Sequence, residues 1–80
     1  MRLILESKKM PKIKWGVIGT GSIANAFAHS IKHCNHSELI SVYGRNKETL
    51  KLFSKKFNIN GVHAVDILVS SNDVDAIYIA

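Results

Sequence analysis

The chain has 80 residues, of which 46% are hydrophobic and 21% charged, and its formal net charge is +5. This composition is that of a soluble globular protein. It excludes a disordered chain, and no apolar run reaches the roughly 18 residues that cross a membrane. Five basic residues and one acid fall within residues 1–14, so the other 66 residues carry only +1. Because no aromatic side chain is interleaved with these basic residues for base stacking, we expect no nucleic-acid partner.

Residues 1–11 are predicted to form a basic extension ahead of the folded part. They contain only three consecutive apolar residues, too few for the hydrophobic region of a signal peptide. Met10-Pro11, directly before the first predicted strand, would suit a natural start. The one cysteine, Cys34, cannot form an intramolecular disulfide, which is typical of a reducing compartment. We therefore expect a cytoplasmic protein without a membrane segment.

The stretch Ile13–Ala28, IKWGVIGTGSIANAFA, predicts a strand, a tight turn and a helix. The spacing Gly19-x-Gly21-x-x-Ala24 is the dinucleotide-binding pattern with alanine in the last place. Gly19 permits the turn, Gly21 lets a pyrophosphate approach the backbone, and Ala24 lets helix and strand pack closely. The free N–H groups at the positive dipole end of the helix would face the phosphates.

Alternating apolar periods predict the remaining elements. In chain order we expect a helix over residues 22–34, a strand over 38–43, a helix after Asn46, a short strand over 62–64, a short helix from residue 65 that stops near 70–73, and a strand over 76–80. This βαβαβαβ order predicts an α/β fold with a parallel sheet, strand order 3-2-1-4 and helices on both faces. The sequence stops where a ligand-binding loop would begin, so we interpret residues 12–80 as the opening part of a longer domain.

The residues after the second predicted strand distinguish between cofactors. Proteins that hold an unphosphorylated adenosine ribose generally place Asp or Glu there, about 20 residues beyond the glycines. This chain offers Gly44-Arg45-Asn46 instead. Arg45 brings a planar, permanently charged donor to the place of a 2′-phosphate, and Gly44 leaves room for it. NADP(H) is therefore favoured over NAD(H), and also over S-adenosylmethionine, another nucleoside ligand held on glycine-rich first turns.

Arg45 and Asn46 each have a simpler interpretation, as an exposed surface arginine and as a helix cap. The four histidines do not predict a metal site. His29 and His33 are four residues apart on one predicted helix, but Ser30 stands where a catalytic zinc helix would usually carry glutamate. No serine or carboxylate suggests a nucleophile–base pair, so no catalytic residue is predicted within the chain.

Three stretches together resemble the Gfo/Idh/MocA oxidoreductases, the glucose–fructose oxidoreductase and inositol dehydrogenase group. They are IKWGVIGTGSIA at residues 13–24, VYGRN at 42–46 and VDAIYIA at 74–80, within a resemblance that covers about residues 12–80. The pattern is closer to the dihydrodiol dehydrogenase-like branch, whose members carry a small residue and then arginine after strand 2 and use NADP. The resemblance implies the N-terminal part of a Rossmann domain.

Carried over by position, the resemblance implies which residues contact the cofactor. Gly19, Thr20, Gly21, Ser22 and Ile23 would wrap the pyrophosphate, Arg45 and Asn46 would receive the 2′-phosphate, and Ala80 would lie beside the nicotinamide ribose. Beyond Ala80 the family continues with a Thr-Pro-Asn loop, a Glu-Lys-Pro motif whose lysine assists proton transfer, and a substrate domain.

The function implied by this resemblance is hydride transfer between nicotinamide and a hydroxyl- or carbonyl-bearing carbon of a sugar, polyol or related small molecule. It leaves room for a homo-oligomer, and the 80-residue chain alone is expected to be inactive. The alternative from a different class is a non-catalytic module or subunit that senses NADP(H).

Overall fold

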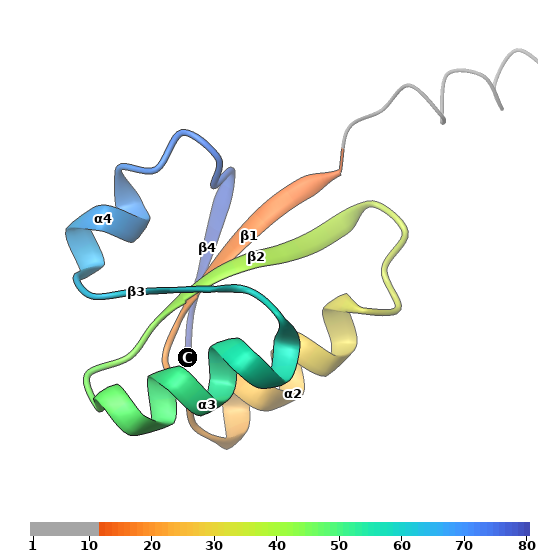
Figure 1. The fold of residues 1–80 in the computed structure, drawn as a ribbon. Coiled ribbons are helices and arrows are strands. Elements are labelled where there is room, and N and C mark those ends of the chain that lie inside the picture. Colours follow the sequence, from red (N-terminus) through yellow and green to blue (C-terminus); the bar gives the residue numbers. More distant parts are fainter. Residues whose placement is uncertain (1–11) are drawn as a thin grey trace, which may run out of the picture.

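The computed structural model describes residues 12–80, and the predicted basic extension at residues 1–11 lies outside this part of the chain. Residues 12–80 fold into a parallel sheet of four strands with three helices between them. In chain order the elements are β1 (Ile13–Ile18), α2 (Ser22–Ile31), β2 (Ser37–Tyr43), α3 (Lys47–Phe57), β3 (Asn60–Val62), α4 (Val65–Val69) and β4 (Ala76–Ile79). The strands lie in the order β3-β2-β1-β4 (Figure 1), which confirms the predicted order.

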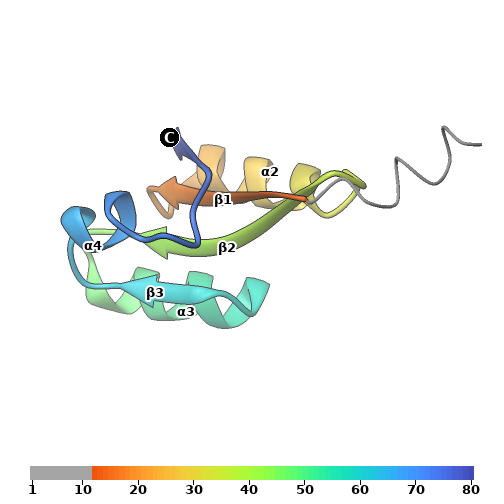
Figure 2. The ribbon, with the colours of Figure 1, turned by 90° about the horizontal axis from the view of Figure 1, so that it is seen from above.

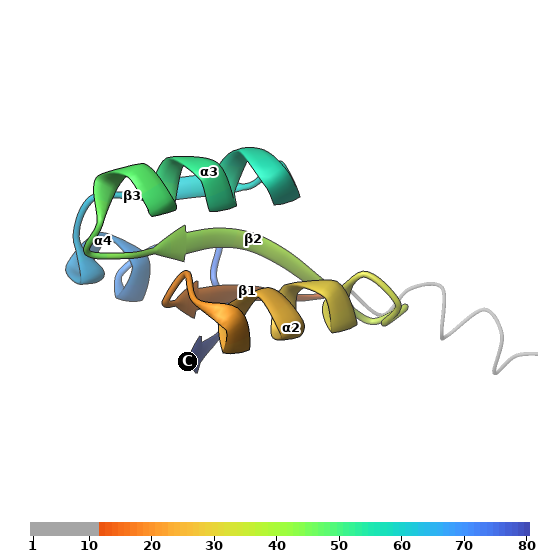
Figure 3. The same ribbon diagram turned by 90° about the horizontal axis from the view of Figure 1, so that it is seen from below.

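Helices cover both faces of the sheet, as predicted, because successive side chains of a strand point to opposite faces. α2 and α3 lie against one face and α4 against the other (Figures 2 and 3). Val17 of β1 and Val42 of β2 are partners in the sheet and have no exposed surface. They form the main core with four buried residues of the two helices, Ala24, Ala28, Leu50 and Phe53.

On the opposite face, the short helix α4 is held mainly by Leu68. This side chain is fully buried and lies over Gly16 in the middle of β1. A Cβ atom on Gly16 would come within 2.9 Å of Leu68 Cδ1 and 3.4 Å of Val74 Cγ1. A glycine at this strand position therefore lets α4 approach the sheet closely.

α2 ends at Ile31, three residues earlier than the predicted end at Cys34. The N–H groups of His33 and Cys34 donate to the carbonyls three residues before them, those of Ser30 and Ile31, at 3.1 and 3.0 Å. Such bonds tighten the last turn and close the helix. The helical spacing of apolar residues continues to Cys34, although the backbone is no longer α-helical after Ile31.

β3 is displaced toward the N-terminus from the predicted residues 62–64, and this prediction was wrong in its boundaries. Asn58 adopts the left-handed conformation with φ of 55° and ends α3, so that the chain reaches β2 by Asn60. Gly61 lies beneath α3, where a Cβ atom would be 3.3 Å from Leu50 Cγ. Asparagine and glycine are poor strand formers, so pairing with β2 determines β3 more than propensity does.

We predict that Leu68→Ala lowers the free energy of unfolding by about 2 to 5 kcal/mol, because it leaves a cavity between α4 and β1. Urea denaturation followed by circular dichroism would measure this loss. The matched control is Ile67→Ala on the same helix, whose side chain is 52% exposed, with an expected change below about 0.5 kcal/mol. Similar losses for both variants would contradict the described packing of α4.

Candidate cofactor site

The candidate site lies where β1, β2 and β4 end at the carboxyl edge of the sheet (Figure 1). The Gly19 N–H donates to the Tyr43 carbonyl at 2.8 Å, and the Ala80 N–H donates to the Ile18 carbonyl at 2.9 Å. These bonds bring the three strand ends together around an open hollow of about 330 Å³. Its lining residues are Ile18, Gly19, Thr20, Tyr43, Gly44, Arg45, Asn46 and Ala80.

Six of the nine predicted site residues therefore line one hollow: Gly19, Thr20, Gly44, Arg45, Asn46 and Ala80. The other three, Gly21, Ser22 and Ile23, follow Thr20 directly at the start of α2. The fold thus brings together the turn between β1 and α2, residues 19–21, and the turn after β2, residues 44–46. We call the first of these the glycine turn. The two turns are more than twenty positions apart in the sequence.

The two glycines of the first turn have different structural roles. Gly19 has φ of +126°, a conformation that L residues rarely adopt, and a Cβ atom on it would lie 3.2 Å from the Ala80 Cβ. Gly21 has φ of −84° and ψ of −163°, which any residue adopts, and a Cβ atom on it would meet nothing within 4 Å. Gly19 is therefore required by the fold, whereas Gly21 leaves open space beside the backbone.

The N-terminus of α2 is suited to an anion. No side chain caps it, and the first helical hydrogen bond runs from the Asn25 N–H to the Gly21 carbonyl at 2.9 Å. The N–H groups of Ser22, Ile23 and Ala24 thus have no helical acceptor. The first turn carries no acidic residue, so no negative charge opposes the positive end of the helix dipole. Together with the open space at Gly21, these residues fit a pyrophosphate group.

Thr20 links the glycine turn to the turn after β2. A Cβ atom on Gly44 would come within 2.7 Å of Thr20 Cγ2, so glycine at this position lets the two backbones approach. The Thr20 hydroxyl donates to Thr49 Oγ1 at 3.1 Å, and the Thr49 hydroxyl donates to the Asn46 carbonyl at 3.1 Å. The sequence predicts only that Gly44 leaves room for a phosphate, and it does not indicate this close approach to Thr20.

Asn46 caps α3, which confirms the simpler of its two interpretations. Its Oδ1 atom accepts hydrogen bonds from the N–H groups of Glu48 and Thr49 at 2.9 and 3.1 Å. The cap uses the side-chain oxygen, so the Nδ2 group is the part of the amide with donors for an anion. Arg45, one residue earlier, is exposed and lines the hollow.

Sequence reasoning missed a second set of residues that hold the glycine turn. The Asn25 Nδ2 group donates to the Gly21 carbonyl at 2.9 Å, and Lys56 Nζ of α3 donates to Asn25 Oδ1 at 2.9 Å. The sequence does carry a signal for Asn25, because asparagine is unfavourable inside a helix and this one stands among small and apolar residues. The glycine pattern itself includes neither Asn25 nor Lys56.

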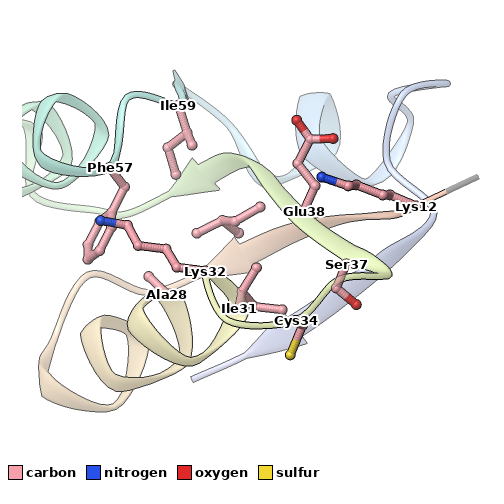
Figure 4. Close-up of a pocket in the computed structure, with 10 residues that line it drawn as sticks. Lys12, Ala28, Ile31, Lys32, Cys34, Ser37, Glu38, Phe57 and Ile59 are labelled. Atoms are coloured by element: carbon pink, nitrogen blue, oxygen red, sulfur yellow. The ribbon is translucent and has the colours of Figure 1, made fainter.

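A second hollow, of about 220 Å³, lies near the starts of β1 and β2, between the C-terminal ends of α2 and α3 (Figure 4). Its apolar lining includes Ile31, Phe57 and Ile59, and Lys32 and Glu38 also line it. It shares no residue with the hollow at the glycine turn.

Two further observations concern the described residues only. Within residues 12–80, no three His, Cys, Asp or Glu side chains gather closely enough to hold a metal ion. None of the helices in this part of the chain combines the length and apolar character needed to cross a membrane.

The parallel sheet of order 3-2-1-4, with a glycine turn between β1 and α2, defines an α/β domain of the Rossmann type. The family model Gfo/Idh/MocA, described as an oxidoreductase family with an NAD-binding Rossmann fold, matches residues 13–80. The chain belongs to this family, as its sequence resemblance had indicated.

Named relatives agree with this assignment. Glucose-6-phosphate 3-dehydrogenase of Bacillus subtilis (strain 168) is 33% identical over 60 residues, which cover 75% of this chain and 17% of that protein. A 3-ketoreductase from Actinomadura kijaniata, solved with TDP-benzene and NADP, is 28% identical, with a TM-score of 0.78 over 85% of this chain and 22% of its own. The WlbA dehydrogenase of Bordetella pertussis, solved with NADH and UDP-GlcNAcA, is 27% identical, with a TM-score of 0.77 over 86% and 21%. The chain thus spans 17 to 22% of the length of these relatives.

We predict that Gly19→Ala lowers the free energy of unfolding by about 1 to 2 kcal/mol, because alanine is strained at this positive φ and meets Ala80. Gly21→Ala, the matched control in the same turn, should change it by less than about 0.5 kcal/mol. Urea denaturation of both variants measures the difference. Equal losses would contradict the distinct roles of the two glycines.

Proposed function

We propose that the chain is the NADP(H)-binding segment of an oxidoreductase that transfers hydride between nicotinamide and a hydroxyl- or carbonyl-bearing carbon of a sugar, polyol or related substrate. Membership of the Gfo/Idh/MocA family supplies the oxidoreductase class and NAD(P) binding. The observation that carries the choice of NADP(H) is the position of Arg45, which lines the hollow next to the glycine turn. The segment that follows β2, Gly44-Arg45-Asn46, contains no carboxylate for an unphosphorylated ribose.

Each part of the cofactor has candidate partners in the chain. The residues proposed for the pyrophosphate are those of the turn and the start of α2: Gly19, Thr20, Gly21, Ser22 and Ile23. The backbone N–H groups there are the donors, and the helix dipole favours the negative charge. The nicotinamide, when bound, donates or accepts the hydride. Ala80, at the end of β4 and against Gly19, is proposed to lie beside the nicotinamide ribose.

Arg45 is proposed to pair with the adenosine 2′-phosphate, with Asn46 as a second donor through its Nδ2 group. A guanidinium presents two parallel N–H donors to a phosphate and keeps its charge at all physiological pH values. One similar solved protein holds NADP and another holds NADH, so both cofactors occur among the proteins that this chain is similar to. The pair of a small residue and arginine, Gly44-Arg45, supports NADP and a place in the dihydrodiol dehydrogenase-like branch.

The substrate proposal is supported by the relatives. One acts on glucose 6-phosphate by its name, and another was solved with UDP-GlcNAcA. The catalytic groups and the substrate domain are proposed to lie beyond residue 80, because the chain spans only about a fifth of the length of its relatives. We propose that the intact protein is cytoplasmic, has no nucleic-acid partner and is able to form a homo-oligomer. The competing function, an NADP(H) sensor, would bind the cofactor and turn over no substrate.

We predict that Arg45→Ala in the intact protein weakens NADPH binding by about 1.5 to 3 kcal/mol and leaves NADH binding unchanged, because the arginine serves only the 2′-phosphate. Fluorescence titration with both cofactors measures the two dissociation constants. The matched control is Lys47→Ala, which removes a neighbouring exposed cation that does not line the hollow. Equal losses for NADPH and NADH in Arg45→Ala would refute the assignment.

We further predict that Gly21→Val abolishes the binding of NADPH and NADH alike and leaves the circular dichroism spectrum intact. The valine side chain would enter space that is open in the protein but is needed by a pyrophosphate. Titration of the variant with both cofactors measures their affinities, and its circular dichroism spectrum reports whether the fold is kept. Retained affinity would mean that this turn does not hold a pyrophosphate.

A further inference from the structure

Asn25 joins three parts of the molecule through one side chain. It lies in α2, and its Nδ2 group donates to the Gly21 carbonyl at 2.9 Å and to the Thr20 carbonyl at 3.4 Å. Its Oδ1 atom accepts a hydrogen bond from Lys56 Nζ at 2.9 Å. Lys56 comes from α3, which lies beside α2 on the same face of the sheet (Figure 3). Both ends of the amide are therefore engaged, one by the glycine turn and the other by α3.

The carbonyls that Asn25 holds determine the direction of the donors that follow them. A peptide group is planar and trans, so the carbonyl of one residue and the N–H of the next point in opposite directions within one plane. Holding the Thr20 carbonyl thus orients the Gly21 N–H, and holding the Gly21 carbonyl orients the Ser22 N–H. Both N–H groups then point away from Asn25.

Sterics alone do not fix these two peptide groups. The backbone angles of Gly21 are open to any residue, and a Cβ atom on it would meet nothing within 4 Å. Glycine also has greater backbone conformational freedom than any other residue. The Gly21 carbonyl accepts hydrogen bonds from both the backbone N–H and the side chain of Asn25, each at 2.9 Å. One residue therefore supplies most of the restraint on this peptide.

Lys56 strengthens the restraint from the far side of the amide. An ammonium group that donates to Oδ1 polarises the amide and makes its Nδ2 hydrogens better donors. The same ammonium lies 5.2 Å from the centre of the Phe57 ring, which packs edge-on against the ring of His29 in α2. Lys32, the residue directly after α2, lies over the same ring, with its Nζ atom 5.3 Å from the ring centre.

We propose that Asn25, supported by Lys56, is a positioning residue that holds the glycine turn in the form that receives the pyrophosphate. The inference rests on the proposed function and goes beyond it, because the glycine pattern includes neither side chain. It predicts that Asn25 affects the pyrophosphate half of the cofactor and not the half at Arg45. A purely structural role would affect both halves together.

The test uses the intact protein and two ligands, NADP⁺ and adenosine 2′-monophosphate, which lacks the pyrophosphate. Asn25→Ala should weaken NADP⁺ binding about tenfold, as expected for a lost orienting hydrogen bond, and leave the affinity for the monophosphate unchanged. Unchanged NADP⁺ affinity, or an equal loss for both ligands, would overturn the proposal. Wild-type protein that binds neither ligand would instead refute the proposed function.

A second variant keeps the proposal testable even if Asn25→Ala fails to fold. Lys56→Met should weaken NADP⁺ binding about threefold and have no further effect when combined with Asn25→Ala. Lys32→Met is the matched control, because it removes the other cation over Phe57 without touching Asn25. If Lys56→Met binds NADP⁺ as tightly as wild type, or loses no more affinity than Lys32→Met does, the role of the pair is overturned.

Discussion

The carboxyl edge of the sheet depends on one backbone turn, at Gly19. Its φ of +126° sends the chain from β1 into α2, and its N–H donates to the Tyr43 carbonyl. Ala80 lies against its Cα atom, so the ends of β2 and β4 are both defined by this one residue without a side chain. A larger residue would strain the turn and push β4 away. The hollow exists because three strand ends can meet at this point.

Two polar links then hold the turn to α3. Thr20 reaches the start of α3 through Thr49, and Asn25 reaches its last turns through Lys56. These links are hydrogen bonds between side chains that are partly or fully exposed, so each contributes little to global stability. Their effect is geometric: the Thr20 link relates the turn after β1 to the turn after β2, and the Asn25 link relates the first turns of α2 to the last turn of α3. The site is thus assembled from two helices and three strand ends.

Much of this arrangement could be predicted from the sequence, because local chemistry and global fold agree at those positions. The glycine spacing predicts the turn, the apolar periods predict the elements, and their βαβαβαβ order predicts the strand order. Asn46 is also predicted to cap α3, as it does. The end of α2 was wrong because its last turn tightens into bonds three residues apart, which apolar spacing does not report. β3 was misplaced because pairing with β2 determines it. The contact of Asn25 with Lys56 joins α2 to α3, and the contact of Thr49 with Thr20 joins α3 to the turn after β1. No spacing rule within one helix contains either contact.

The central claim is that this edge binds NADP(H) through the turn after β1 and the arginine after β2. A crystal structure of the intact protein with NADP⁺ tests it most directly. The pyrophosphate is predicted to lie on the N–H groups at the start of α2, over Gly21, with the 2′-phosphate paired with the Arg45 guanidinium. A cofactor whose pyrophosphate lies away from Gly21, or whose 2′-phosphate is directed away from Arg45, would contradict the claim.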